Sequence, residues 1–387
     1  MKKLSGILIL QRIIPHYRKG FFDKFRRLYP DTNIFFGQPL KSESLKNSEN
    51  LDKSFYFEKR NFYFDKDGRI FITGFYRDLF RLKPRIIISV FNTGNLNIYI
   101  LFLLRYFLKF RIILWSFGFD PVNGFNPEKR TTDKIRLYLS QKADAVIYYW
   151  EKGKNEVSAF SEKTDHYFVA PNTLDTEKLS VIKKEFDKKG KDEIKKELNV
   201  NQQFHFVYTG RLLEDKQIDI LIRAYSILES ERSDCRLSII GRGPEESKLI
   251  KLSEELNLKN IVFPGEILDE EESGKWIYIS DAFIMPGRLG LSVVHSFSYG
   301  TPVISQSKKG YFHGEGVGYI KNGVNGYLVE DGNINELAEK MKDIISNKEL
   351  SSLLRQNAQS TVINECSVEA MLNGFQKAVN FVSVKNN

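Results

Sequence analysis

Short apolar segments that alternate with helical patterns constrain the fold of this sequence more than any other feature. Such runs are typical of strands buried on both faces of a parallel sheet. A first series lies at residues 4–10, 33–36, 86–90, 111–114, 145–148 and 166–169. A second series lies at residues 204–209, 237–240, 260–263, 282–285, 302–304 and 326–329. Two separate series predict two doubly wound α/β domains with a cleft between them.

The length of 387 residues also favours two domains. A turn-rich break at residues 171–176 leads into a Lys-rich polar segment, residues 183–201, and we place the inter-domain linker there. The domains are therefore predicted at residues 1–170 and 171–366. Apolar residues at helical spacing within 368–381 predict a closing helix.

Two further segments of the first half carry their own patterns. Aromatic residues alternate with polar ones through residues 53–73, which predicts short antiparallel strands. Residues 96–109 are apolar on nearly every side and are interpreted as a core helix, with a membrane-touching helix as the alternative. Arg105 and Lys109 interrupt this run, which is too short and too charged to span a bilayer.

The cysteine content indicates the compartment. Only two cysteines are present, Cys235 and Cys366, which argues against a disulfide framework and fits a reducing environment. Neither has a neighbour at the spacing of zinc ligands, so no metal site is predicted. The first apolar run stops at Gln11 and Arg12 and does not resemble a secretory signal. We therefore expect a cytoplasmic protein.

Charge is distributed unevenly along the chain. Residues 1–170 contain 30 Lys and Arg against 17 Asp and Glu, a net charge of +13, whereas residues 171–387 contain 28 against 32, a net charge of −4. A basic half suggests an anionic partner. No nucleic-acid-binding motif is present, so nucleic acid is not expected. Because aromatic and aliphatic residues separate the cations, an anionic membrane surface is the favoured partner.

Residues 285–303 form the best candidate for an anion site. They indicate a strand end, a glycine-containing loop at 287–290, a helix at 292–299, and a stop at Gly300 before a new strand. A helix that starts directly after a buried strand presents free backbone N–H groups and a positive dipole end. An ordinary strand–loop–helix unit is the simpler alternative for this stretch alone.

Two more loops follow predicted strands of the second half. Gly210 is followed by Arg211 and Lys216, and two cations beside a helix start would suit a diphosphate leaving group, whose charge grows as its bond breaks. The loop that begins at Gly241 resembles the opening of a dinucleotide fingerprint, but Glu246 replaces the third glycine. NAD binding is therefore rejected, and a glycine turn near a nucleotide remains open.

The first predicted strand also leads into a polar segment. His16, Arg18 and Lys19 follow it, and ligands of open α/β sheets bind at loops that leave the carboxyl ends of strands. These three residues are therefore predicted to form a substrate loop. A basic, solvated turn is the alternative.

Several motifs, taken in chain order, resemble glycosyltransferase family 4. They lie at residues 208–216, 239–244, 262–265, 281–286, 299–303 and 323–329. Residues 169–175 resemble the linker motif of that family, and residues 143–147 resemble a strand motif that precedes it. The resemblance covers nearly the whole C-terminal half.

The resemblance implies a GT-B fold, which consists of two facing Rossmann-like domains with the final helix, about residues 367–387, crossing back to the first. It implies that the first domain binds an acceptor and the second a UDP- or GDP-linked nucleotide sugar. It also implies transfer with retention, without a metal or other cofactor. Arg211 and Lys216 match the catalytic diphosphate-binding pair. The residues predicted to bind the donor, either at family positions or close to them, are Gly210, Gly241, Gly290, Leu291, Ser292, His295 and Glu315.

Two departures from the family pattern concern the donor. The family usually has two glutamates at the positions of Gly287 and His295. A histidine can still hydrogen-bond a ribose hydroxyl, and Glu315 or His313 on the next loop is a hypothetical replacement for the missing sugar contact. On the acceptor side, Phe117 stands where related enzymes often have a histidine, and Asp120 is the nearest polar substitute.

The sequence therefore predicts a glycosyltransferase of cell-surface polysaccharide biosynthesis that acts on a glycan or lipid-linked acceptor at the inner face of the plasma membrane. Its predicted acceptor-binding residues are His16, Arg18, Lys19 and Asp120. The missing glutamates leave a second hypothesis, a catalytically inactive GT-B-like binding or assembly protein. A sugar-nucleotide epimerase on the same fold is a third.

Overall fold

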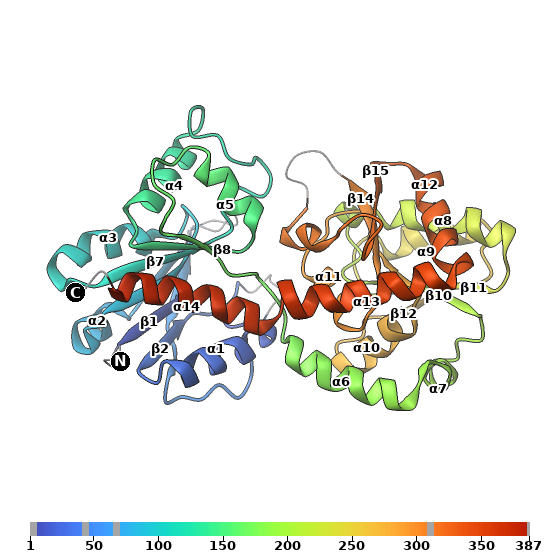
Figure 1. The fold of residues 1–387 in the computed structure, drawn as a ribbon, viewed down its shortest axis with the longest axis horizontal. Coiled ribbons are helices and arrows are strands. Elements are labelled where there is room, and N and C mark those ends of the chain that lie inside the picture. The colour runs from blue at the N-terminus through green and yellow to red at the C-terminus, as the bar shows by residue number, and fades with distance from the viewer. Residues whose placement is uncertain (1–5, 41–45, 65–69, 308–312, 385–387) are drawn as a thin grey trace. The chain divides into compact units, whose positions relative to one another are not determined.

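The computed structural model describes residues 6–40, 46–64, 70–307 and 313–384. The chain divides into two compact units (Figure 1). Unit 1 contains Met1–Asp175 and Val368–Asn387, and unit 2 contains Thr176–Ser367. Positions 4 and 5 of the first predicted strand, and positions 65–69 of the predicted antiparallel segment, lie outside the described residues.

Unit 1 is built on a seven-stranded sheet in the order β3-β2-β1-β6-β7-β8-β9, in which every pair of neighbours is parallel. Its strands are β1 (Ile7–Gln11), β2 (Thr32–Phe36), β3 (Tyr56–Glu58), β6 (Ile86–Phe91), β7 (Arg111–Ser116), β8 (Ala145–Tyr148) and β9 (Tyr167–Val169). The central strands are buried along almost their whole length, which explains their continuous apolar sequences. The chain reverses direction across the sheet between β1 and β6, as in a doubly wound fold.

The predicted antiparallel strands of residues 53–73 are correct only in part. β4 (Arg60–Tyr63) and β5 (Ile70–Thr73) pair antiparallel, with Phe62 opposite Phe71. β3, however, joins the main sheet parallel to β2. The alternating pattern identified strands but could not give their direction, because side chains alternate in the same way in both kinds of pairing.

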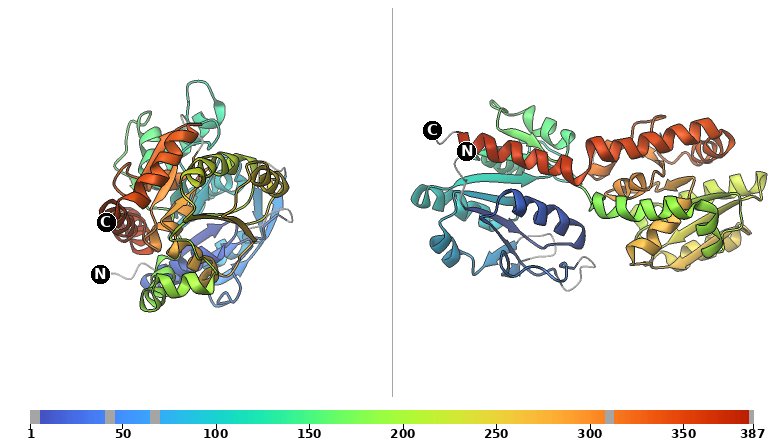
Figure 2. Two further views of the ribbon diagram at one scale, coloured as in Figure 1. Left: turned by 90° about the vertical axis from the view of Figure 1, so that its right-hand side faces the viewer. Right: turned by 60° about the horizontal axis from the view of Figure 1, so that its bottom comes forward.

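Helices cover the unit 1 sheet (Figures 1 and 2). They are α1 (His16–Leu28), α2 (Tyr76–Leu82), α3 (Leu96–Leu108), α4 (Thr131–Lys142), α5 (Glu151–Ser158) and α14 (Val368–Val384). The last helix packs against β8, β9 and α1, so the C-terminal segment completes the core of the first unit. Phe375 lies at its centre, with its ring 4.8 Å from that of Phe21 and 5.0 Å from that of Trp115.

The interpretation of residues 96–109 as a core helix is wrong for one side of the helix. In α3, Asn97, Ile98 and Leu101 are buried, but Leu103, Tyr106 and Phe107 are exposed. The composition of the segment could not reveal this, because its inward and outward sides are both mainly apolar.

Unit 2 contains a six-stranded parallel sheet in the order β12-β11-β10-β13-β14-β15. Its strands are β10 (Phe204–Thr209), β11 (Cys235–Ile240), β12 (Ile261–Gly265), β13 (Ala282–Ile284), β14 (Val303–Ser307) and β15 (Gly326–Glu330). Its helices are α6 (Thr176–Lys189), α7 (Lys191–Glu197), η1 (Glu214–Lys216), α8 (Ile218–Glu231), α9 (Glu246–Glu255), α10 (Glu270–Ile279), α11 (Ser292–Ser298), η2 (Glu315–Tyr319), α12 (Ile334–Ser346) and α13 (Lys348–Glu365).

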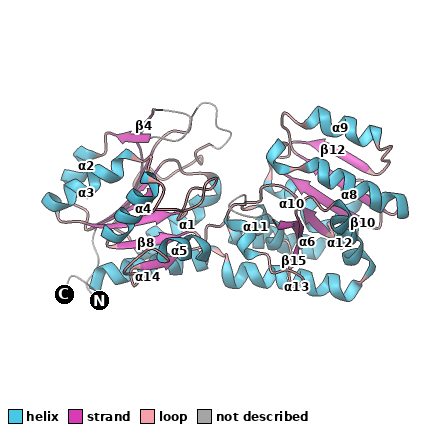
Figure 3. Cartoon of the chain, turned by 90° about the horizontal axis from the view of Figure 1, so that it is seen from above, coloured by secondary structure: helices cyan, strands magenta, loops and turns pink. Residues whose placement is uncertain are grey.

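The Lys-rich segment 183–201 is not a linker. Most of it forms α6 and α7, which pack against α10 and α11 through buried residues such as Leu179, Phe186 and Ile194 (Figure 3). Several of its lysines are exposed, whereas Lys183 and Lys191 lie over the Tyr278 ring of α10. Two short amphipathic helices can thus have the polar composition of a solvated linker. Of the proposed linker, residues 171–175 are outside helices and strands.

Among the described residues, no helix combines the length and the apolar character needed to cross a bilayer. The same part of the chain contains no cluster of three or more His, Cys, Asp or Glu side chains arranged to hold a metal ion.

We expect Phe375→Ala to destabilise unit 1 by about 3–5 kcal/mol, because the substitution removes a fully buried ring that contacts several aromatic side chains. Urea unfolding followed by circular dichroism measures the change. Leu353→Ala, on an exposed position of α13, is the matched control. Equal effects of the two substitutions would show that α14 is not part of the unit 1 core.

Candidate functional site

The loops that follow β10 and β13 form the centre of the candidate site. The two strands are adjacent and parallel, so their carboxyl ends meet at the same edge of the sheet. Two backbone hydrogen bonds join the loops: Gly287 N–H donates to the Lys216 carbonyl at 2.9 Å, and Arg288 N–H donates to the Asp215 carbonyl at 2.7 Å. The loop predicted from residues 285–303 is therefore fixed against the loop that carries Lys216.

Gly287 is the residue that permits this approach. A Cβ atom at position 287 would lie 2.2 Å from the Asp215 carbonyl oxygen and 2.2 Å from the Lys216 carbonyl carbon. Both are backbone atoms, which cannot move aside as a side chain would. The absence of a glutamate at this position thus follows from the way the two loops pack.

Three cations gather around the joined loops. Lys216 donates from Nζ to the Arg288 carbonyl oxygen at 2.6 Å, and its side chain is largely buried. Burial lowers the pKa of Lys216, Asp215 opposes this shift, and the charges of Arg288 and Arg211 lower the pKa further. Lys216 contacts the backbone of Arg288, and Arg211 lies in the loop after β10 that leads to Lys216. The Asp215 carboxylate is 3.9 Å from Lys216 Nζ and balances only one of the three charges.

Arg211 is the most accessible member of this cluster. Its side chain makes no hydrogen bond or ion pair within the part of the chain that the structure describes, whereas Tyr208 donates to its carbonyl oxygen at 2.8 Å and holds its backbone. Arg288 was not predicted as a site residue. Its position one residue after Gly287 was the only available signal, and its relation to Lys216 depends on the pairing of two distant strands.

Gly210 and Gly241 have structural roles in the same edge of the sheet. Both have a positive φ angle, and a Cβ atom on Gly241 would lie 1.9 Å from the Gly210 carbonyl oxygen. Gly243, which was not predicted, is equally restricted, because its Cβ atom would lie 2.2 Å from the Leu212 carbonyl oxygen. The glycines allow the loops after β10 and β11 to lie in direct backbone contact.

The predicted helix start is present but short. α11 has seven residues, so the dipole effect at its N-terminus is small. Within the described residues, the backbone N–H groups of Leu291 and Ser292 have no hydrogen-bond acceptor, as is usual in a first helical turn. Gly290 has open space where a side chain would stand, and its carbonyl lies against Gly316 of the η2 turn.

His295 is held by a carboxylate from another helix. Its Nε2 atom lies 2.6 Å from Glu270 Oε1, and Tyr299 donates to the same oxygen at 3.0 Å. Burial alone would raise the pKa of Glu270, but the hydrogen bond and charge of His295, together with Tyr299, lower it below the usual range. Glu270 was not predicted, because 25 residues separate it from His295 and no local pattern connects them.

The next loop braces the site. His313 is buried, accepts from the Leu289 N–H at Nδ1 over 3.3 Å, and lies 2.8 Å from the Gln306 carbonyl oxygen at Nε2. This arrangement corresponds to a neutral ring with its proton on Nε2. Glu315 is also buried, in the first turn of η2. The structure thus gives His313 a bracing role, whereas the sequence left it open as a sugar contact.

The predicted acceptor residues belong to unit 1. The expected substrate loop at His16, Arg18 and Lys19 is wrong in its local structure, because these residues form the first turns of α1. Arg18 donates to Asn172 Oδ1 at 3.0 Å and lies over the Trp115 ring at 4.5 Å. Lys19 pairs with Asp23 at 2.6 Å.

Asp120 forms a local turn in unit 1. It accepts hydrogen bonds from the backbone N–H groups of Val122 and Asn123 at 3.0 and 2.7 Å. Burial opposes ionisation of Asp120, but these hydrogen bonds outweigh it and lower its pKa. Phe117 packs its ring against Phe119 and Trp150 and offers no polar group.

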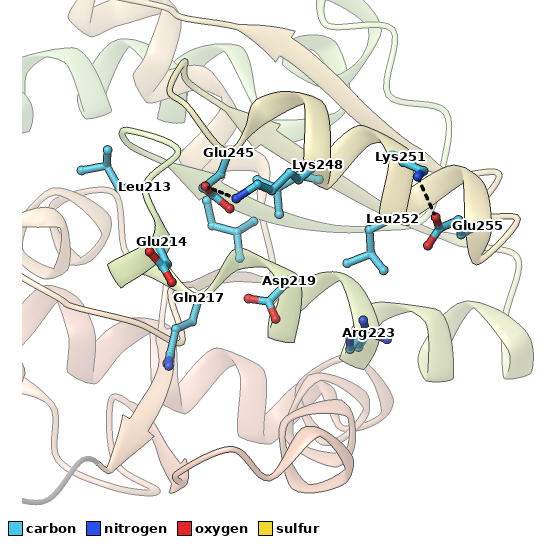
Figure 4. A pocket seen from close by; sticks show the side chains of 12 residues that line it. Leu213, Glu214, Gln217, Asp219, Arg223, Glu245, Lys248, Lys251, Leu252 and Glu255 are labelled. Carbon is cyan, nitrogen blue, oxygen red and sulfur yellow. Dashed lines mark hydrogen bonds and ion pairs between the residues drawn. The ribbon is translucent and has the colours of Figure 1, made fainter.

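A hollow of about 550 Å³ lies between α8 and α9, outside the cation cluster (Figure 4). It is lined by both signs of charge, and the ion pairs Lys248–Glu245 and Lys251–Glu255 lie along α9 on one wall. Asp219, Glu214 and Arg223 also contribute. This balance gives the hollow no selectivity for an anion, so we do not assign the candidate site to it.

Comparison with known sequences finds a matching family model. Residues 190–361 match the model described as "Glycosyl transferases group 1". A poly(ribitol-phosphate) α-N-acetylglucosaminyltransferase from Staphylococcus aureus is 25% identical over 166 residues, which cover 43% of this chain and 33% of the relative. The capsular polysaccharide biosynthesis glycosyltransferase CapM, also from Staphylococcus aureus, is 24% identical over 258 residues, covering 60% of this chain and 66% of the relative. The chain thus spans a third of the first relative and just under two thirds of the second.

Solved structures resemble nearly the whole chain. A glycosyltransferase from Rickettsia africae has a TM-score of 0.73 and 17% identity, covering 99% of this chain and all of its own. HepE from Anabaena, solved in complex with UDP, has a TM-score of 0.67 and 15% identity, covering 97% of this chain and all of its own. With the two parallel sheets, these matches confirm the predicted α/β fold of the GT-B class.

We expect Glu270→Gln to destabilise unit 2 at neutral pH by about 1.5–3 kcal/mol, the usual loss for a hydrogen bond to a charged group. The folded-state pKa of Glu270 is lowered, so its stabilisation is present above the ordinary glutamate pKa and is lost as pH falls through the folded value. Urea unfolding should therefore show a large difference between wild type and variant at neutral pH and a small one in acid. A difference that grows in acid would contradict the pairing with His295.

We expect Gly287→Ala to cost about 1–3 kcal/mol, because the added methyl group would overlap the backbone at Asp215 and Lys216. Gly290→Ala, in the same loop, is the matched control, since its Cβ atom would meet nothing within 4 Å. Thermal unfolding measures both. Equal stability of the two variants would show that the loops are not in contact as described.

Proposed function

We propose that this chain is a glycosyltransferase that transfers a sugar from a nucleoside diphosphate sugar to a growing cell-surface glycan. The observation that carries the proposal is the cluster of Arg211, Lys216 and Arg288 at the carboxyl edge of the unit 2 sheet. All three lie within the segment that matches the group 1 glycosyl transferases. One relative from Staphylococcus aureus is named for transfer to poly(ribitol-phosphate) and the other for capsular polysaccharide biosynthesis, and both names support a polymer as the acceptor.

A diphosphate fits the charge of this cluster. As the bond between the anomeric carbon and the donor phosphate breaks, negative charge develops on the departing diphosphate. Arg211 can supply a planar fork of N–H donors, and Lys216 retains donors beyond the one directed at Arg288. The two loops are joined by backbone hydrogen bonds, and the Lys216 ammonium group is fixed by the Arg288 carbonyl, before the donor arrives, so little reorganisation of this part of the site opposes the reaction.

Metal independence and retention are parts of this proposal that come from the family resemblance. Three cations can provide the positive charge that a metal ion supplies in other transferases. The complex of HepE with UDP supports a uridine nucleotide as the first donor to test, with GDP-linked sugars as the second. No cofactor besides the donor substrate is proposed.

His295 with Glu270 is proposed as the replacement for the glutamate that the family has at the ribose position. The His295 ring is hydrogen-bonded to Glu270, so a carboxylate lies next to the side chain that occupies the position of the family's glutamate. Gly287 has no such replacement, because the neighbouring backbone fills its side-chain space. We propose that two other segments contact the donor sugar instead, the loop at Gly290 and the η2 turn that begins at Glu315. These two segments lie against each other.

The alternative of a catalytically inactive binding protein rests on the same missing glutamates. It predicts tight binding of UDP without turnover of UDP-sugars on polysaccharide acceptors. An epimerase would convert the donor without any acceptor. Measuring nucleotide release and sugar transfer in parallel, with and without acceptor, distinguishes the three functions.

We expect Arg211→Gln to lower the rate of transfer about 10²–10³-fold, the usual loss when one transition-state donor is removed. Because the Arg211 side chain is exposed and makes no hydrogen bond or ion pair with described residues, the thermal stability of the variant should equal that of wild type. Lys251→Gln, in the charge-balanced hollow between α8 and α9, is the matched control and should retain full activity.

Calorimetric titration with UDP completes this test. Under the proposed function, Arg211→Gln and Lys216→Gln both weaken UDP binding, and the doubly substituted protein loses transfer. Wild-type transfer rates in the double variant would overturn the site assignment. Unchanged UDP affinity in wild type and double variant would place the nucleotide elsewhere.

A further inference from the structure

The outer side of α3 in unit 1 is formed by apolar and aromatic residues. Tyr99, Leu103, Tyr106 and Phe107 are exposed, with exposed fractions of 73% for Tyr106 and 74% for Phe107. Their spacing of four, three and one residues places them on one side of the helix. We call these four residues the outer face of α3.

The inner side of the same helix carries its polar contacts. Asn97 is buried beneath the helix within hydrogen-bonding distance of Tyr76 of α2, and Ile98 and Leu101 are buried beside it. A surface helix of a water-soluble domain normally has the opposite arrangement, with its apolar stripe inward and polar residues outward. An exposed apolar surface such as the outer face of α3 is typical of a site that contacts a membrane or another protein.

Three basic residues lie near the C-terminal end of α3. Lys83, Arg85 and Lys109 are exposed and form no ion pair among the residues that the structure describes. They lie together because β6 and β7 are adjacent, and Arg111 N–H donates to the Arg85 carbonyl oxygen at 2.8 Å. Tyr106 and Lys109 line one shallow hollow at this end, which joins the outer face to the cations.

The helices that carry these residues are neighbours. α2 and α3 lie close together in Figure 3, and the contact between Tyr76 and Asn97 joins their first turns. Lys83 directly follows α2, and Lys109 directly follows α3. The three free cations and the outer face thus belong to one continuous region of unit 1.

We propose that this region docks unit 1 onto an anionic lipid bilayer, with the outer face of α3 in the interfacial layer and Lys83, Arg85 and Lys109 on acidic headgroups. At thirteen residues, α3 is about 20 Å long and cannot cross a hydrocarbon core of about 30 Å, so it lies along the surface. Tyrosine and basic side chains are suited to the boundary between headgroups and acyl chains.

Charge distinguishes a lipid surface from a second copy of this chain. In a symmetric dimer through the outer face, the same patch of both copies would meet. The three cations of one copy would then approach those of the other. The carboxylates that line the same hollows are Asp144, which already pairs with Arg105 and Arg111, and Asp31, whose single charge does not balance three. Acidic headgroups neutralise these cations instead, and each cation near such a surface contributes a favourable attraction.

This inference rests on unit 1 and does not require the proposed function. It extends that function by placing the transferase at the membrane, where a lipid-linked acceptor would be available. Because the lipid contact can be measured without any sugar nucleotide, failure of one proposal is distinguishable from failure of the other.

Co-sedimentation of the full chain with vesicles tests the proposal. We expect binding to vesicles of phosphatidylglycerol and phosphatidylcholine in equal parts at low salt, and at least tenfold weaker binding to pure phosphatidylcholine. About 1 M salt, which shortens the Debye length to roughly 3 Å, should release most of the protein. Equal binding to both vesicle types, or no binding to either, would overturn the proposal.

Two variants separate the contributions of the outer face and the cations. Tyr106→Ser with Phe107→Ser should weaken vesicle binding at least tenfold, whereas the control Leu353→Ser with Ile363→Ser, on exposed positions of α13, should leave it unchanged. Replacing Lys83, Arg85 and Lys109 by Gln should weaken binding by about fivefold per cation. The same replacement of Lys184, Lys196 and Lys259, three exposed lysines of unit 2, is its control.

Sedimentation velocity without lipid tests the competing occupant. We expect a single species that the Tyr106→Ser and Phe107→Ser substitutions do not change. A wild-type dimer that these substitutions dissociate would assign the outer face to a second copy and overturn the lipid proposal. Vesicle binding by the outer-face variant at wild-type strength would overturn it as well.

Discussion

The backbone contact between Gly287 and the segment at Asp215 and Lys216 is the constraint on which the candidate site depends. It joins the loops after β10 and β13 through two hydrogen bonds and leaves no room for a side chain at position 287. The same contact brings the Arg288 carbonyl to the Lys216 ammonium group. One close approach of two loops thus excludes the expected glutamate and gathers the cations, so the loss of an acidic side chain and the gain of a basic cluster have one physical cause.

Sequence patterns predicted what depends on local order along the chain. Continuous apolar runs identified the strands of both sheets, and the motifs around Arg211 and Lys216 identified the loops after them. Contacts between distant segments could not be predicted in this way. Glu270 reaches His295 from another helix, and Arg288 acquires its importance only through the pairing of β10 with β13. The first turns of α1 were taken for a loop because the cations Arg18 and Lys19 hide the helical pattern, although each has a partner in the fold.

The orientation of α3 is a second feature that amino-acid composition could not predict. Its residues are apolar on almost every side, and a sequence that is apolar all round fits a buried helix equally well. Only the described neighbours show which side is covered, and they place the polar Asn97 inward and Tyr106 outward. The sequence likewise shows that residues 1–170 are basic but not where the positive charge gathers on the surface. The fold brings three unpaired cations together beside α3.

The two positive regions differ in how their charge acts. In unit 2 the cations stand in a segment whose overall charge is slightly negative, so attraction for an anion is confined to the few ångströms around Lys216, where burial reduces screening. In unit 1 the cations are exposed and the surrounding sequence is strongly basic, so attraction extends over the surface and is sensitive to salt. A confined charge suits a small diphosphate that must be bound in one geometry. A distributed charge suits a surface of many mobile headgroups, none of which needs a fixed position.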